Sequence, residues 1–146
     1  MEIRALTEPS DRTAALSLAL DVFMAFVAPD YAPEGVETFR AFVSGGDAAD
    51  ALAVYGAYAD GVLAGMIATR NGGAHISLFF VDPRFQRRGV GRALFERAAA
   101  NCAEDTLTVH SSPYAKAVYE RLGFTAICGE QLSDGIRYYP MKYRKS

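Results

Sequence analysis

The hydrophobic positions in the first part of the chain recur with the spacing of helices. Residues 2–6 alternate between polar and apolar and predict a short strand. The segment after them places one residue of each helical turn on a common apolar face, formed by Leu16, Leu20, Phe23 and Val27. Prolines end this helix, and a second helix is predicted over residues 33–43, closed by Gly45 and Gly46. Its inward positions are Val36, Phe39, Phe42 and Val43.

The pattern changes to that of strands from residue 52 onward. Three segments, 52–59, 62–70 and 74–81, are separated by Asp60-Gly61 and by Asn71-Gly72-Gly73, which favour tight hairpin turns. These segments predict an antiparallel meander. The third one contains HISLFFV, which is apolar on both faces, so we expect it at the centre of a sheet.

Helical and strand patterns alternate in the remainder of the chain. A helix is predicted over residues 89–102, a strand over 106–110, and a further helix from Pro113 to Gly123. Strands near 124–128 and 136–143 follow. Together the elements predict an α+β fold with a mixed, mostly antiparallel central sheet flanked by helices.

The composition indicates a single globular domain over residues 1–146. The chain is 51% hydrophobic and 22% charged, with a formal net charge of −2, so we expect no nucleic-acid partner. The apolar stretch at 14–28 contains Asp21 and is too short to span a bilayer, so no membrane association is expected. Cys102 and Cys128 fit neither a disulfide framework nor a metal site, which favours free thiols in the cytoplasm.

The segment VDPRFQRRGVGRAL at 81–94 carries the clearest chemistry. Its loop leads from the central strand into a helix and holds four arginines, Arg84, Arg87, Arg88 and Arg92. A helix N-terminus is electropositive and leaves its first N–H groups unpaired, so cations there indicate a missing anion. Gly89 and Gly91 allow those N–H groups to face a phosphate or pyrophosphate. The alternative is an ordinary solvated loop. The segment matches neither the dinucleotide pattern GxGxxG nor a Walker A loop.

Two motifs resemble those of one known family. QRRGVG at 86–91, after a strand that ends in Val81-Asp82-Pro83, resembles the acetyl-CoA pyrophosphate motif of the GNAT superfamily of N-acetyltransferases. AVYERLGF at 117–124 resembles the final-helix signature of that superfamily. The order of predicted elements is similar to the GNAT fold along nearly the whole chain. The resemblance implies a sheet that splays between strands 75–81 and 106–110.

The resemblance also implies a set of contacts with acetyl-CoA and no metal. Backbone N–H groups around residues 86–92 are expected to hold the pyrophosphate, and main-chain atoms of Phe80 and Val81 to pair with the pantetheine arm. Many members carry an asparagine seven residues before the helix tyrosine, where this chain has Ser112, whose shorter hydroxyl either replaces that contact or loses it. The implied cofactor-binding residues are Phe80, Val81, Gln86, Arg87, Arg88, Gly89, Val90, Gly91, Arg92 and Ser112.

Acyl transfer to an amine needs an acid for the departing thiolate and a base for the amine. Tyr119 stands where the resemblance places a tyrosine that protonates the coenzyme A sulfur, although its apolar helix face also fits a core tyrosine. His110 ends the splaying strand, and its ordinary pKa of about 6.5 suits a general base. The alternatives for the base are His75, Asp30, Glu34 and Glu37.

Acceptor choice in the family depends on the first two helices and on the loop between the last strands. The corresponding segments here, 26–39 and 129–139, are aromatic and acidic, which suits a primary amine of a small molecule or a peptide. The expected pocket walls are Phe26, Tyr31, Tyr138 and Tyr139. Tyr114 either lines the acyl end or caps the start of the last helix.

The sequence thus predicts an acetyl-CoA-dependent N-acetyltransferase that works by direct attack in a ternary complex. A non-catalytic acyl-CoA-binding sensor or subunit is the alternative, and a nucleotide-binding domain that uses the same loop is a weaker one. The apolar strand at 138–143 is expected at an exposed sheet edge, where it would allow pairing in a homodimer.

Overall fold

The computed structural model describes residues 1–145 and has the α+β fold that the sequence predicts. In chain order, the elements are β1 (Glu2–Leu6), α1 (Pro9–Phe26), the 3-10 helix η1 (Ala28–Asp30), α2 (Pro33–Val43), α3 (Asp47–Asp50), β2 (Ala53–Ala59), β3 (Val62–Arg70), β4 (His75–Val81), the 3-10 helix η2 (Pro83–Phe85), α4 (Val90–Ala100), β5 (Thr106–Ser111), α5 (Lys116–Leu122), β6 (Thr125–Ala126), β7 (Gln131–Ser133) and β8 (Ile136–Arg144).

The strands form one sheet in the order β1-β2-β3-β4-β5-β8-β6, with β7 paired to β8 off this path. β4 is in the middle, as its two apolar faces predict. It pairs in parallel with β5, whereas the other strand pairs of this sheet are antiparallel. The hairpin turn before β3 has positive φ at Asp60 and Gly61, 54° and 76°, which is the conformation that a two-residue hairpin loop favours.

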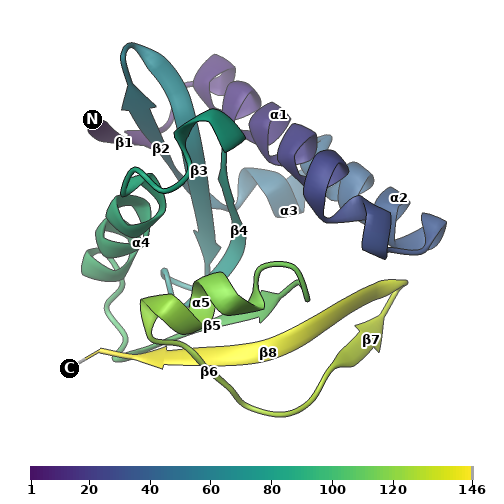
Figure 1. Ribbon diagram of the computed structural model, residues 1–146. Coiled ribbons are helices and arrows are strands. Elements are labelled where there is room, and N and C mark those ends of the chain that lie inside the picture. The colour runs from purple at the N-terminus through teal and green to yellow at the C-terminus, as the bar shows by residue number, and fades with distance from the viewer. Residues whose placement is uncertain (146) are drawn as a thin grey trace.

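Helices cover both faces of the sheet, and each face has its own hydrophobic core. α1 and α2 lie on one face and α4 and α5 on the other (Figure 1). The face of α1 that is buried is centred on Ala15, Ala19 and Phe23, whereas the predicted Leu16 and Leu20 are only partly buried. Small alanine side chains allow the helix to pack closely on β3 and β4, which turns the larger leucines toward the rim of the interface.

Three local expectations were wrong at the C-terminal end. α5 begins at Lys116 instead of Pro113, because the Ala115 N–H donates to both the carbonyl and the hydroxyl oxygen of Ser112 and closes a turn first. The strand near 124–128 shortens to β6, and β7 was not predicted. β8 is not an exposed edge, because β5 and β6 occupy its two sides. The predicted homodimer therefore loses the argument from an exposed edge and stays a prediction.

Within residues 1–145, no helix combines the length and the hydropathy that a membrane span requires.

Candidate active site

The sheet opens at a bulge in β4. Ile76 and Leu78 face consecutive residues of β3, so Ser77 between them is an extra residue without a partner on that strand. β4 and β5 pair only at residues 75–76 of β4, immediately before the bulge. A bulge bends its strand and interrupts the ladder, so residues 77–81 diverge from β5. The splay that the family resemblance implied is confirmed, and it leaves one edge of β4 unpaired.

A cavity of about 950 Å³ fills this opening. It is bounded by β4, by the loop after β4, by β5 and α5, and by segments of α1, α2 and the β7–β8 hairpin. The predicted site residues that line it are Phe80, Val81, Gln86, Arg87, Gly89, Val90, Gly91, Arg92, His110, Ser112 and Tyr119. The fold therefore gathers the predicted cofactor-binding and catalytic residues around one space, with the exception of Arg88.

The loop before α4 presents a row of free backbone N–H groups to the cavity. α4 begins at Val90 without a capping side chain, and Arg87 and Gly89 have φ values of 63° and 82°. The first N–H to find an acceptor is that of Ala93, which donates to the Gly89 carbonyl at 3.1 Å. Across residues 1–145, the N–H groups of residues 87–92 have no acceptor. This arrangement at the positive end of a helix is typical of an anion-binding site.

Gly91 stands at a position where the contacts within residues 1–145 would also accept alanine. A Cβ on Gly91 would be 3.6 Å from Phe79 Cζ, which is ordinary van der Waals contact, and the residue has no positive φ. Neither packing nor backbone conformation therefore requires a glycine there. A ligand that came close to the backbone at the start of α4 would require one.

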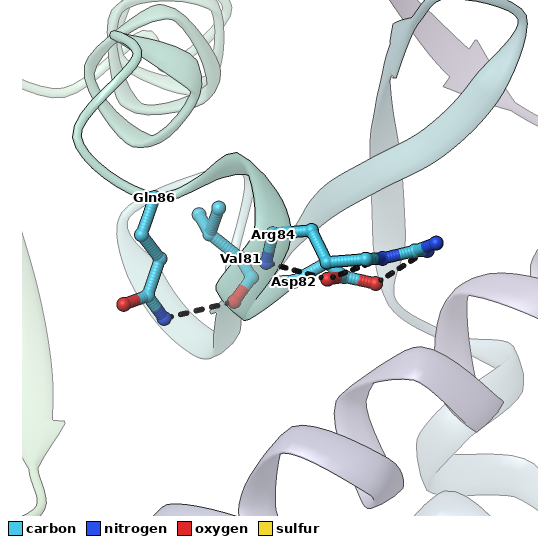
Figure 2. A network of polar contacts seen from close by, with 4 residues as sticks. All are labelled: Val81, Asp82, Arg84 and Gln86. Atoms are coloured by element: carbon cyan, nitrogen blue, oxygen red, sulfur yellow. Dashed lines mark hydrogen bonds and ion pairs between the residues drawn. The ribbon is translucent and has the colours of Figure 1, made fainter.

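Side chains at the end of β4 hold this loop in place (Figure 2). The Arg84 Nε and Nη2 atoms donate to the two Asp82 carboxylate oxygens at 3.1 and 3.0 Å, and the bound Arg84 side chain lowers the pKa of Asp82. The Gln86 amide donates to the Val81 carbonyl at 3.1 Å. Gln86 was predicted as a cofactor contact. Its side chain ties the loop to β4, so its N–H neighbours at 87–92 are the groups free for a ligand.

The arginines around the loop differ in position. Arg88 is the predicted site residue that lies outside the cavity, because its guanidinium sits 3.9 Å from Asp60 and over the Phe85 ring. Arg92 lines the cavity and donates to the Arg121 carbonyl at 3.3 Å. Arg87 is exposed, lines the cavity, and forms no ion pair within residues 1–145. Of the neighbouring pair Arg87 and Arg88, Arg87 is thus the one available to a ligand in the cavity.

Tyr119 lies on α5 between the sheet and the cavity. Its ring packs edge-on against Phe79 and Phe124, at centroid distances of 5.9 and 5.3 Å, and burial raises its pKa well above the usual value. Within residues 1–145 its hydroxyl has no hydrogen-bond partner, yet it is not among the fully buried polar atoms that lack one. The hydroxyl therefore reaches the open cavity, protonated and free to donate. Tyr119 therefore packs in the core with its ring and lines the cavity as well.

Two histidines lie where β4 and β5 part. His75 is buried, its Nδ1 is 2.8 Å from Thr108 Oγ1, and burial lowers its pKa to about 4, with Arg70 and His110 adding to the shift. The His110 ring stacks on Tyr138 at 4.5 Å and meets the His75 ring edge at 4.9 Å. Burial, and after it Arg70, lowers the pKa of His110. Both rings are accordingly neutral near pH 7.

The acidic alternatives for the base are not supported by their positions. Asp30, Glu34 and Glu37 do not line the cavity, whereas Asp134 in the β7–β8 turn does. The aromatic residues predicted as pocket walls also fall into two groups, those that line the cavity and those that do not. Tyr31, Tyr114 and Tyr138 line the cavity, but Phe26 and Tyr139 do not. Tyr139 follows Tyr138 along a strand and therefore points to the opposite face, and Phe26 stacks on Tyr114 at 5.8 Å.

Several cavity residues were missed by sequence reasoning. Arg70, Ser77 and Asp134 line the cavity next to the predicted residues. The Ser77 Oγ is a buried polar atom without a hydrogen-bond partner among residues 1–145. Asp134 lies in an Asp-Gly pair, which is a hairpin signal that could have located the turn. Ser77 carries no such signal, because a bulge is set by pairing with another strand. The turn signal after Arg70 marks the end of its strand but does not show which cavity the side chain lines.

Comparison with known proteins agrees with this geometry. Residues 27–145 match the family described as "Acetyltransferase (GNAT) domain". The chain belongs to the GNAT acetyltransferase family. A curated relative, "Uncharacterized N-acetyltransferase YafP" of Escherichia coli (strain K12), is 42% identical over 53 residues, which cover 36% of this chain and 34% of that protein. The GNAT chain thus aligns with about a third of the length of this relative.

Solved structures share the GNAT fold. A GCN5-related N-acetyltransferase from Rhodopseudomonas palustris superposes with a TM-score of 0.79 at 22% identity and covers 98% of this chain and 94% of its own. The PaiA N-acetyltransferase from Thermoplasma acidophilum, solved in complex with coenzyme A, gives 0.70 at 17% identity, with 99% of each chain covered. The ribosomal-protein-S18-alanine N-acetyltransferase from Escherichia coli gives 0.65 at 24% identity and covers 99% and 94%.

Proposed function

We propose that this GNAT protein is an N-acetyltransferase that transfers the acetyl group of acetyl-CoA to a primary amine of a small molecule or a peptide. The observation that carries the proposal is the row of unpartnered N–H groups at residues 87–92 next to the unpaired edge of β4. A pyrophosphate fits the first feature, and an extended arm that contains amide groups fits the second. Coenzyme A combines both chemistries in one molecule.

We assign the acid and the base of the reaction to Tyr119 and His110, which line the cavity from α5 and β5. The amine nitrogen forms a bond to the acetyl carbon, the carbon–sulfur bond breaks, and the thiolate takes the Tyr119 proton. Burial raises the pKa of Tyr119, so the hydroxyl keeps its proton until negative charge develops on sulfur. The neutral His110 ring, at the point where the strands part, accepts the proton that the amine loses. No covalent enzyme intermediate is required.

We also propose that the protein acts in the cytoplasm. Cys102 is buried and Cys128 is exposed, and both are free thiols. Cysteines without a disulfide partner are more typical of proteins in a reducing compartment.

Calorimetric titration with acetyl-CoA tests the cofactor assignment. Dephospho-coenzyme A and ATP are titrated in parallel as controls for other phosphate ligands. We expect micromolar affinity for acetyl-CoA and at least about tenfold weaker binding of ATP, which lacks the arm that pairs with β4. Equal affinity for ATP would favour the nucleotide-binding alternative, and absence of binding by acetyl-CoA would contradict the proposal.

Turnover separates the enzyme from a non-catalytic sensor. Release of coenzyme A thiol is followed with pools of primary amines, namely polyamines, amino acids and peptides. An N-acetyltransferase releases thiol in proportion to an acetylated product, whereas a sensor binds acetyl-CoA and releases none.

A further inference from the structure

Four neighbouring strands place a row of polar side chains on one face of the sheet. Arg70 of β3 is the register partner of His75 of β4, and residues directly opposite each other share a face. His75 contacts Thr108 of β5 through its ring, and His110 lies two residues further along that strand, on the same face. Tyr138 of β8 stacks on the His110 ring at 4.5 Å. We refer to Arg70, His75, His110 and Tyr138 as the polar row, and all four line the cavity.

Arg70 is the charged member of the polar row. Burial lowers the pKa of His75 and His110, and the nearby Arg70 guanidinium lowers both pKa values further, so the two rings are neutral near pH 7. Neutral rings cannot balance the charge of the guanidinium. Arg70 is exposed, and it forms no ion pair in the part of the chain that the structure describes.

The other charged side chains of the cavity do not supply the missing counter-charge. Arg87 and Arg92 belong to the segment with the free N–H groups, and the Arg121 carbonyl accepts a hydrogen bond from Arg92. Among the described residues, Asp134 provides the only carboxylate in the lining, and it forms no ion pair with Arg70. The polar row therefore presents an unbalanced cation to a ligand in the cavity.

The surroundings of the polar row favour a carboxylate as that ligand group. A guanidinium holds a carboxylate through two parallel hydrogen bonds, and such a pair is stronger where water is partly excluded. Apolar side chains of α1 and α2, namely Val22, Phe23, Phe39 and Phe42, line the same cavity. His75 lies between Arg70 and the proposed base, with its ring centroid 4.9 Å from that of His110. An anion bound at Arg70 is thus close to the place where the acceptor amine loses its proton.

We propose that Arg70 binds the carboxylate of the acceptor and that the acceptor is a free amino acid. The inference rests on the proposed function and narrows its acceptor from primary amines in general to amines that carry a carboxylate a few bonds away. A polyamine would bring a second cation toward Arg70, and a lysine side chain within a peptide would bring no anion there.

The chain provides a matched control for the loss of this charge. Arg70 is the last residue of β3, and Arg144 is the last residue of β8. Arg144 is also exposed, forms no ion pair within the described residues, and does not line the cavity. Arg144→Gln therefore changes the net charge by the same amount as Arg70→Gln and leaves the polar row intact. Arg70→Lys keeps the charge and removes the two-pronged donor.

The test compares pools of acceptors with the full-length protein and acetyl-CoA. One pool contains the standard amino acids, a second contains their α-amides, and a third contains polyamines. The compound that is acetylated fastest is then measured singly with its amide or acid counterpart. We expect the wild type to prefer the amino acid over its amide by at least about tenfold in kcat/KM, the usual effect of a lost hydrogen bond to a charged group. The amine of an amide loses its proton more readily, so this preference cannot come from the reactivity of the amine.

The variants assign the preference to Arg70. Arg70→Gln should reduce it by about tenfold, Arg70→Lys should reduce it less, and Arg144→Gln should leave it unchanged. Calorimetry in the presence of coenzyme A gives a readout that does not depend on turnover. The N-acetyl form of the preferred amino acid should bind about tenfold more weakly to Arg70→Gln than to the wild type, whereas its amide should bind equally to both.

Three results would overturn the inference. They are equal or better use of amides or polyamines by the wild type, an unchanged preference in Arg70→Gln, and an equal loss in Arg144→Gln. Absence of acetylated product from every pool, with acetyl-CoA still bound, contradicts the proposed function instead.

Discussion

The two ends of the cavity are built on different principles. The phosphate end is a continuous segment, residues 87–92, that offers backbone N–H groups. The opposite end, which we call the acceptor end, is formed by side chains from several elements, namely Tyr31, Arg70, His75, His110, Asp134 and Tyr138. An anion common to every reaction of the family can be bound by backbone alone, whereas the group that varies between enzymes is contacted by side chains from several elements.

The difference predicts how each end responds to substitution. At the phosphate end, a change should affect cofactor affinity with little effect on folding, because the free N–H groups have no partner in the protein. At the acceptor end, His75 and Tyr31 are buried or partly buried and hydrogen-bonded, so changes there should affect stability as well. Tyr119 lies between the two ends and should affect the chemical step most.

The largest expected effect is that of Tyr119→Phe on turnover. The variant removes the proposed acid and keeps the ring that packs on Phe79 and Phe124. We expect kcat to fall by about 10²- to 10⁴-fold, the usual contribution of a general acid, with the dissociation constant for acetyl-CoA nearly unchanged. Steady-state kinetics and calorimetry measure the two quantities. An unchanged kcat would show that the sulfur takes its proton from elsewhere.

Gly91→Ala should weaken acetyl-CoA binding and leave the fold intact. The new methyl group makes only ordinary contact with Phe79 in the free protein but meets a ligand at the start of α4. We expect about ten- to hundredfold weaker binding, the equivalent of the 1–3 kcal/mol that overpacking costs. The thermal midpoint should stay the same or rise, because alanine favours a helix by about 1 kcal/mol over glycine. Lower affinity with a lower midpoint would instead indicate a folding defect.

His75 should make the protein less stable in acid. The folded protein keeps His75 neutral down to about pH 4, whereas the unfolded chain takes up a proton near its ordinary pKa of 6.5. Protonation therefore favours the unfolded chain, and the stability present above pH 6.5 is lost as the pH falls toward 4. After allowance for solvent screening, the loss is about 2 kcal/mol.

The non-titrating variant His75→Asn isolates this effect. Urea denaturation at pH 7 and pH 4 gives the free energy of unfolding of both proteins, and the loss between the two values should be about 2 kcal/mol smaller in the variant. Parallel curves would show that His75 does not carry the pH dependence.

The smallest expected effect separates Arg87 from Arg88. Arg87 lines the cavity without an ion pair in the described chain, and Arg88 lies outside it near Asp60. Arg87→Gln should weaken acetyl-CoA binding by about fivefold, as the loss of one exposed charged contact implies, and Arg88→Gln should change it by less than about twofold. Equal effects in the two variants would mean that the loop acts only through its general positive charge.

Much of the phosphate end could be predicted from the sequence. The glycines and arginines at 84–92 are contiguous, and a helix N-terminus has the same free N–H groups in any protein. The meander and its hairpin turns were also predictable, because Asp60-Gly61 and Asn71-Gly72 favour positive φ locally. The sequence pattern could not show which of the neighbours Arg87 and Arg88 lines the cavity. Arg87 lines it, whereas Arg88 lies near Asp60.

The sequence by itself determined the order of the longer elements, without α3 and β7, and it located the arginine-rich loop and the tyrosine on α5. Each of these depends on residues within one or two helical turns. Only the tertiary structure decided that Ser77 is the bulge that opens the sheet, that β8 is interior, and that Gly35 meets Gly135. These features arise from contacts between residues that are far apart in the chain. No local sequence pattern marks either partner of such a contact.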